Sequence, residues 1–221
     1  MRTIVTVILL CIAGAFLKAQ DSAMVAYSYG YNFKNGIYLN FGQFRNNTPV
    51  SIESVVCNYD KDKYDDIYEC IDNSVNLKYY NEYGILTETE TKTLWGYCRN
   101  GKPYVNWSNG FRQIGFIGSV CHFVATVIVY QDMNPTPYYD PYSYNYSGTN
   151  QYYTSELHQL IIDMSTGAIL DFEVQNVERV IQCDTVLYKE FTDLSKRKKR
   201  NMMFYYIRKF NENHPLFLPS D

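Results

Sequence analysis

The fold is decided by residues 94–123, LWGYCRNGKPYVNWSNGFRQIGFIGSVCHF, which hold both tryptophans and five of the twelve glycines. Each glycine costs about 1 kcal/mol in a helix interior, so this stretch favours strands. Asn100-Gly101 is a preferred dipeptide for the type I′ turn of a hairpin, which predicts paired strands over 93–98 and 102–107. Gly115, inside the following strand pattern, predicts a β-bulge or a close backbone approach.

The turn also fixes an expected register. Counting outward from it pairs Arg99 with Lys102 and places Trp95 opposite Asn106. Because neighbours along a strand point to opposite faces, Trp95 and Trp107 are expected on opposite faces of the ribbon, with at least one of them in the core. A further strand is expected over 120–130, where β-branched and aromatic residues dominate.

Residues N-terminal to this stretch predict short strands and polar loops. Residues 24–31 are interpreted as a loose leader or an edge strand, 37–41 as a half-buried strand, and 43–49 as a polar turn. The acidic run 57–74 is interpreted as a solvated loop rather than a Ca²⁺ site, because it lacks the spacing of a calcium loop. Residues 75–80 and 85–93 predict a hairpin whose return strand is polar on both faces, as edge strands are.

Residues C-terminal to it begin with an unusual insertion. The segment 133–153 combines three prolines with many tyrosines, and it is expected to protrude between two paired strands. As a functional loop it is a ligand platform, since tyrosine offers a flat apolar face and a hydroxyl. The alternative interpretation is a surface insertion without a function, which the fold tolerates. The candidate binding residues are Tyr138, Tyr139, Tyr142, Tyr144 and Tyr146.

The remaining chain predicts a hairpin over 156–172 and then helices. Apolar residues recur at helical spacing from Val177 to Phe210, and Asp184 is the expected N-cap of one helix. The basic run 196–200 spreads over more than one helical turn and is interpreted as a solvated helix middle rather than a patch for an anionic partner. The predicted fold is therefore α+β: an antiparallel β-meander of about eight strands in a curved or barrel-like sheet (residues 24–172), followed by C-terminal helices (173–213).

The first residues have the pattern of a secretory signal peptide. Arg2 precedes an apolar run, and Ala19 is a small residue suited to cleavage before Gln20. The prediction is a signal peptide over 1–19 and a single domain over 20–221, secreted, periplasmic or at the cell surface. The apolar run is too short for a membrane span, and no later stretch comes close to one. The formal charge of −3, more negative once Arg2 and Lys18 are removed, argues against nucleic acid as a partner.

The sequence contains no recognised catalytic motif and predicts no cofactor. No phosphate loop, nucleophile elbow or zinc-binding helix motif is present. Neighbours Cys121 and His122 are expected on opposite faces of a strand, so they cannot act as nucleophile and base. The histidines are far apart, and no metal site is predicted. The mature chain has five cysteines, Cys57, Cys70, Cys98, Cys121 and Cys183. Because this number is odd, at least one thiol is unpaired or shared between chains.

Four blocks of the sequence resemble an uncharacterised family of secreted proteins from Bacteroidota. They are GIYLNFGQFRNNTPV (36–50), the stretch 94–123, IDMSTGAILDF (162–172) and MMFYYIRKFNENHPLFLP (202–219). The resemblance implies an envelope or extracellular bacterial protein and supplies no catalytic residue. The favoured hypothesis is a non-catalytic module that binds a glycan, a peptide or another envelope component through exposed aromatic residues. The alternatives are a hydrolase with an unrecognised site and a structural component of a surface assembly.

Overall fold

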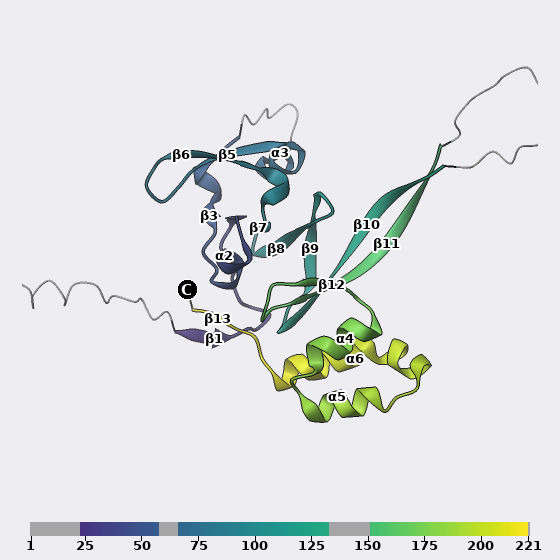
Figure 1. Cartoon of the computed structure of the whole chain (residues 1–221). Helices are drawn as coiled ribbons and strands as arrows, with labels where there is room; N and C mark the ends of the chain where they lie inside the picture. Colours follow the sequence, from purple (N-terminus) through teal and green to yellow (C-terminus); the bar gives the residue numbers. More distant parts are fainter. Residues whose placement is uncertain (1–22, 58–65, 133–150, 221) are drawn as a thin grey trace, which may run out of the picture.

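An eight-stranded antiparallel sheet forms the centre of the molecule and confirms the predicted α+β class (Figure 1). The computed structural model describes residues 23–57, 66–132 and 151–220. The strands lie in the order β12-β11-β10-β9-β8-β7-β2-β3, so β7 to β12 form the predicted meander. The strands of the whole sheet are β2 (Gly36–Tyr38), β3 (Val50–Ser51), β7 (Gly96–Arg99), β8 (Lys102–Trp107), β9 (Gly110–Phe116), β10 (Val120–Asp132), β11 (Gln151–Asp163) and β12 (Ile169–Asp171).

Two smaller sheets flank the central one. β4 (Val55–Val56), β5 (Asn76–Tyr80) and β6 (Leu86–Glu90) contain the predicted hairpin, with the polar strand β6 at the sheet edge as expected. β1 (Met24–Ala26) pairs with β13 (Phe217–Pro219), which brings the two ends of the described chain side by side (Figure 1). Ile52–Ser54 and Thr91–Thr93 form short 3-10 helices, so the return strand ends at Glu90, earlier than predicted.

The central hairpin has the predicted register. Arg99 pairs with Lys102 and Cys98 with Pro103, while Asn100 and Gly101 both have positive φ angles, of 53° and 72°. These are the angles that a type I′ turn requires, which explains the Asn-Gly dipeptide. The turn thus sets which side chains of β7 and β8 face each side of the sheet.

Gly115 occupies the predicted bulge. His122 of β10 pairs with Phe116 of β9, whereas the next residue, Phe123, pairs with Ile114, so Gly115 is the extra residue. A Cβ atom at this position would meet nothing within 4 Å, which rules out the alternative of a close backbone approach. The bulge interrupts the pairing of β9 with β10 and helps the sheet to curl.

The predicted placement of the tryptophans on opposite faces is wrong. Both Trp95 and Trp107 pack against the same hydrophobic cluster. β7 begins only at Gly96, and the 3-10 helix Thr91–Thr93 lies just before it. Strand alternation therefore does not extend back to Trp95. Leu94 accordingly packs in a different cluster. Both rings are half-buried, and Trp95 is stacked on Phe44 at a centroid distance of 4.2 Å.

Two short helices stand where loops were predicted. The predicted turn at 43–49 is partly α2 (Phe41–Arg45), because Asn40 caps the backbone N–H of Gln43 and the Gln43 side chain accepts from the N–H of Leu39. The predicted loop at 57–74 contains α3 (Ile67–Asn73), whose N-terminus is capped by Asp66. Side-chain caps of this kind stabilise helix ends that propensity alone does not predict.

The C-terminal helices are those predicted, α4 (Val174–Ile181), α5 (Thr185–Thr192) and α6 (Lys196–Asn213), and they lie together beside one end of the sheet (Figure 1). Asp184 caps α5 as expected, accepting from the N–H of Leu187 at 3.0 Å. The basic run 196–200 forms the start of α6 rather than a helix middle. Within it, Lys199 forms an ion pair with Glu178 of α4 at 2.7 Å.

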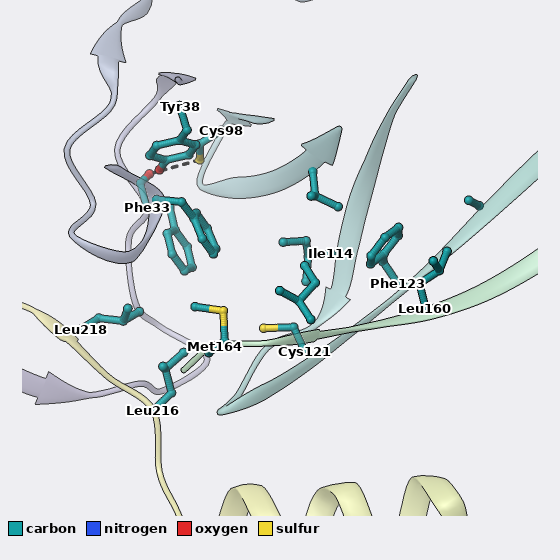
Figure 2. Close-up of a cluster of buried hydrophobic side chains, with 14 residues drawn as sticks. Phe33, Tyr38, Cys98, Ile114, Cys121, Phe123, Leu160, Met164, Leu216 and Leu218 are labelled. Carbon is teal, nitrogen blue, oxygen red and sulfur yellow. Dashed lines mark hydrogen bonds between the residues drawn. The ribbon is translucent and has the colours of Figure 1, made fainter. Parts of the chain in front are cut away.

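The hydrophobic core is divided into three clusters by the sheet. Cys98 and Val105 face the first cluster, while Tyr97 and Tyr104 on the same hairpin face another. Figure 2 shows the first cluster, in which the Cys98 thiol donates to the carbonyl of Phe33 at 3.4 Å. The C-terminal segment closes this cluster with Leu216 and Leu218 (Figure 2). The remaining cluster packs α4, α5 and α6 against the sheet.

The long hairpin of β10 and β11 projects from the body of the sheet (Figure 1). Its pairing runs from Val120 with Asp163 to Asp132 with Gln151, so the strands that flank the tyrosine-rich insertion pair directly, as predicted. β11 continues into β12 through the turn at residues 165–167, which confirms the last hairpin. Residues 133–150 lie outside the described part of the chain.

Candidate binding cleft

The five tyrosines predicted as a binding platform, Tyr138, Tyr139, Tyr142, Tyr144 and Tyr146, lie outside the described residues. The structure instead reveals a second aromatic group that the sequence analysis missed. It consists of Tyr27, Tyr29, Tyr31 and Phe33, in the segment between β1 and β2. The three tyrosines lie within residues 24–31, for which the sequence predicts a loose leader or an edge strand. The sequence signal is an aromatic residue at every second position from 27 to 33, although the segment forms a coil with a turn and not a strand.

The four aromatic residues line one wall of a cleft of about 590 Å³. The opposite wall consists of the start of β8, with Lys102 and Pro103, and of β9 from Gln113 to Phe116. We name this feature the aromatic cleft. Its volume lies within the range of small-molecule and cofactor sites, about 300–1,000 Å³.

Tyr29 is held at the tip of a turn. The N–H of Tyr31 donates to the carbonyl of Ser28 at 2.9 Å, which closes a four-residue turn with Tyr29 and Gly30 at its centre. The side chain of Tyr29 is fully exposed. Its ring face is therefore open to contact with a ligand in the cleft.

The other aromatics are fixed by contacts with distant parts of the chain. The N–H of Tyr27 donates to the carbonyl of Leu216 at 2.6 Å, and the Tyr31 hydroxyl donates to the carbonyl of Pro219 at 3.0 Å. The ring of Tyr31 meets Phe33 edge-on at 4.9 Å, and Phe33 is buried. The wall is thus preformed, which reduces the entropy lost when a ligand binds.

The polar groups of the cleft suit hydrogen bonding rather than catalysis. They are the hydroxyls of the three tyrosines, the ammonium of Lys102 and the amide of Gln113. Burial raises the pKa of Tyr27, so its hydroxyl stays protonated at neutral pH. Among the described residues, no carboxylate, imidazole, thiol or aliphatic hydroxyl lines this cleft, so its polar side chains are those of the tyrosines, Lys102 and Gln113.

Three residues with candidate chemistry elsewhere in the chain, Cys98, Cys121 and His122, are buried. Burial raises the pKa of both Cys98 and Cys121 to about 12, so each remains a neutral thiol. Cys121 packs in the first cluster, whereas the ring of His122 meets Phe172 and Phe204, which confirms that these neighbours face opposite sides. Burial lowers the pKa of His122, and its ring hydrogen-bonds to Gln159 at 3.2 Å.

The described residues contain no cluster of three or more His, Cys, Asp or Glu side chains placed to hold a metal ion. No helix in the same part of the chain combines the length and apolar character needed to cross a bilayer. Comparison with protein-family models, curated proteins and solved structures finds no match.

Proposed function

We propose that the protein is an exported, non-catalytic binding module that holds a neutral oligosaccharide in the aromatic cleft. The observation that carries this proposal is the preformed wall of Tyr27, Tyr31 and Phe33 with the exposed Tyr29 at its end. The packing of the fold does not require the side chain of Tyr29 to be exposed to solvent.

The chemistry of the cleft matches that of a sugar. A pyranose ring has an apolar C–H face, which stacks on a flat aromatic ring, and a rim of hydroxyls, which pair with tyrosine hydroxyls, amides and ammonium groups. The acidic balance of the chain disfavours polyanionic ligands, since like charges repel. A neutral oligosaccharide offers both apolar ring faces and hydroxyls, and it carries no negative charge for the protein to repel.

Export is supported by two independent features of the chain. The N-terminal pattern of Arg2, apolar run and Ala19 is typical of a signal peptide. Cys57 and Cys70 form a disulfide, and disulfides persist in oxidising compartments outside the cytosol. The resemblance to secreted proteins of Bacteroidota agrees with both and points to the envelope or the cell exterior.

Replacing Tyr29 with alanine is expected to weaken oligosaccharide binding by about tenfold, because an exposed aromatic that stacks on a ligand typically contributes more than 1 kcal/mol. The measurement is calorimetric titration with a panel of neutral hexasaccharides built from glucose, mannose, xylose or N-acetylglucosamine. Tyr83→Ala is the matched control, because Tyr83 is 77% exposed in the turn between β5 and β6 and does not line the cleft. Equal affinities for the two variants would contradict the proposal.

A second candidate function, a structural component of an assembly, is favoured by the projecting ribbon of β10 and β11. Ile128 and Leu157 lie on one face of this ribbon and are 61% and 67% exposed, with Val124 beside them. From Val124 to Gln131, β10 carries no charged side chain. The guanidinium of Arg112 donates to the carbonyl of Thr126 on the edge of β10 at 3.5 Å, so the contact between two copies is placed on the apolar face of the ribbon.

If the ribbon joins two copies of the chain, Ile128→Lys is expected to shift the protein from dimer to monomer, since it places like charges in a symmetric apolar contact. Sedimentation of wild type and variant over a range of concentrations measures this. Val75→Lys, at a similarly exposed residue just before β5, is the control. A wild-type protein that stays monomeric at high concentration rules this candidate out.

A further inference from the structure

A second cavity of about 590 Å³ lies on another part of the molecule, between the helices, the end of β11 and the C-terminal segment. Arg45 at the end of α2 and Arg179 in α4 both line it, together with apolar side chains of Met164, Phe210 and Phe217. It shares no lining residue with the aromatic cleft.

The positive charge in this cavity is not balanced. None of the ion pairs among the described residues includes Arg45 or Arg179. The guanidinium of Arg45 donates to the carbonyl of Phe217, which supplies no countercharge. Burial lowers the pKa of Arg45, a sign that its charge is held at a desolvation cost.

The acidic residue that lines the cavity is already engaged. The carboxylate of Asp163 accepts from the N–H of Ser165 at 2.8 Å, from the Ser165 hydroxyl at 2.6 Å and from the Thr166 hydroxyl at 3.0 Å. These bonds hold the turn after β11. Two arginines and one aspartate therefore line the cavity, which leaves a net positive charge for a ligand.

The same cavity does not assemble a nucleophile and base. Cys183 and His214 both line it, but in the described part of the chain no hydrogen bond joins the thiol to the imidazole. The imidazole of His214 contacts the carboxylate of Asp184 at 3.2 Å.

We propose that this cavity binds a small molecule with an anionic head, carboxylate or phosphate, and an apolar body. The planar fork of a guanidinium pairs with two oxygens of either group, so Arg45 and Arg179 hold the head. Met164, Phe210 and Phe217 form the apolar wall for the body. The site is separate from the proposed oligosaccharide site, and either can fail without the other.

The test uses phenylacetate and phenyl phosphate as probes, with phenylacetamide as the neutral match, in amide NMR titrations of the mature protein. At least one anion is expected to shift the amide signals of Ser165 and Gln182 saturably, and phenylacetamide to bind at least about tenfold more weakly. A response to phenylacetate alone identifies a carboxylate site, and a response to phenyl phosphate alone a phosphate site. The affinity is expected to fall as salt is added.

Arg179→Gln and Arg45→Gln are each expected to weaken anion binding by about tenfold or more, because each removes a charge-assisted hydrogen bond. Arg197→Gln, at an exposed arginine of α6 outside the cavity, is the control and is expected to leave binding unchanged. Arg179 is itself exposed, so its variant decides the matter even if Arg45→Gln does not fold. Binding of phenylacetamide as tight as that of the anions, an unaltered affinity in Arg179→Gln, or no shift with either anion overturns the proposal. Tyr29→Ala is expected to leave anion binding intact.

Discussion

Replacing Phe44 with alanine is expected to lower the free energy of unfolding by about 3–5 kcal/mol. Phe44 is completely buried in the first cluster. Its ring is stacked between Trp95 at 4.2 Å and Phe33 at 5.4 Å, and the ring of Tyr38 meets it edge-on. Truncation removes these contacts and leaves a cavity that the paired strands around it cannot close.

Urea denaturation of wild type and variant measures this loss. Phe217→Ala is the matched control, since Phe217 lies in β13 and is nearly half exposed. Its truncation is expected to cost about 1 kcal/mol, in proportion to the smaller buried area. If the two variants lose the same stability, the first cluster is not the principal core. Phe33 lines the aromatic cleft and packs on Phe44. Phe44→Ala is therefore also expected to weaken oligosaccharide binding.

Removal of the disulfide between Cys57 and Cys70 is expected to cost about 3 kcal/mol. The bond closes a loop with a sequence separation of 13, and the chain-entropy estimate for a loop of this length is about 3 kcal/mol. Cys70 lies within α3, whose residues Tyr68 and Ile71 are buried, so the bond also ties this helix to the end of β4. The double variant Cys57→Ser, Cys70→Ser isolates the effect.

Thermal or urea unfolding under non-reducing conditions measures it. Cys183→Ser is the control, because this thiol is free and exposed and its substitution is expected to change stability by less than about 0.5 kcal/mol. Adding reductant to the wild type is expected to reproduce the loss seen in the double variant. A wild type that is equally stable with and without reductant would show that the bond does not stabilise the fold.

The strands and turns were predictable where local chemistry determines them. The Asn100-Gly101 turn depends on positive φ angles that few residues adopt, and the Asp184 cap depends on a side-chain oxygen that accepts from the N–H of Leu187, so the sequence identifies both. The bulge was readable from a glycine, Gly115, inside a strand pattern. The two short helices were missed because their interiors lack a helical pattern. Their caps, Asn40 with Gln43 and Asp66 with Glu69, were nevertheless readable as start signals.

The tryptophans and the cleft were missed for a different reason. Trp95 lies where a 3-10 helix meets a strand, and alternation does not apply across that junction. The aromatic cleft depends on contacts between the ends of the chain, such as the hydrogen bond from Tyr31 to Pro219 across 188 residues. Residues 27–33 form a coil with a turn rather than a strand, so alternation does not place these aromatics, whereas the pairing of β1 with β13 holds the start of the segment in position.

The central claim, that the aromatic cleft is the ligand site, is tested most directly by mapping where an oligosaccharide binds. Amide NMR spectra of the mature protein are recorded with and without the tightest-binding member of the neutral hexasaccharide panel. The amide signals of Gly101, Gln113 and Gly115 are expected to shift, while those of Tyr83 and Gly84, which lie outside the cleft in the turn between β5 and β6, are expected to stay in place. Shifts confined to residues outside the cleft, or the absence of a shift with every member of the panel, would contradict it.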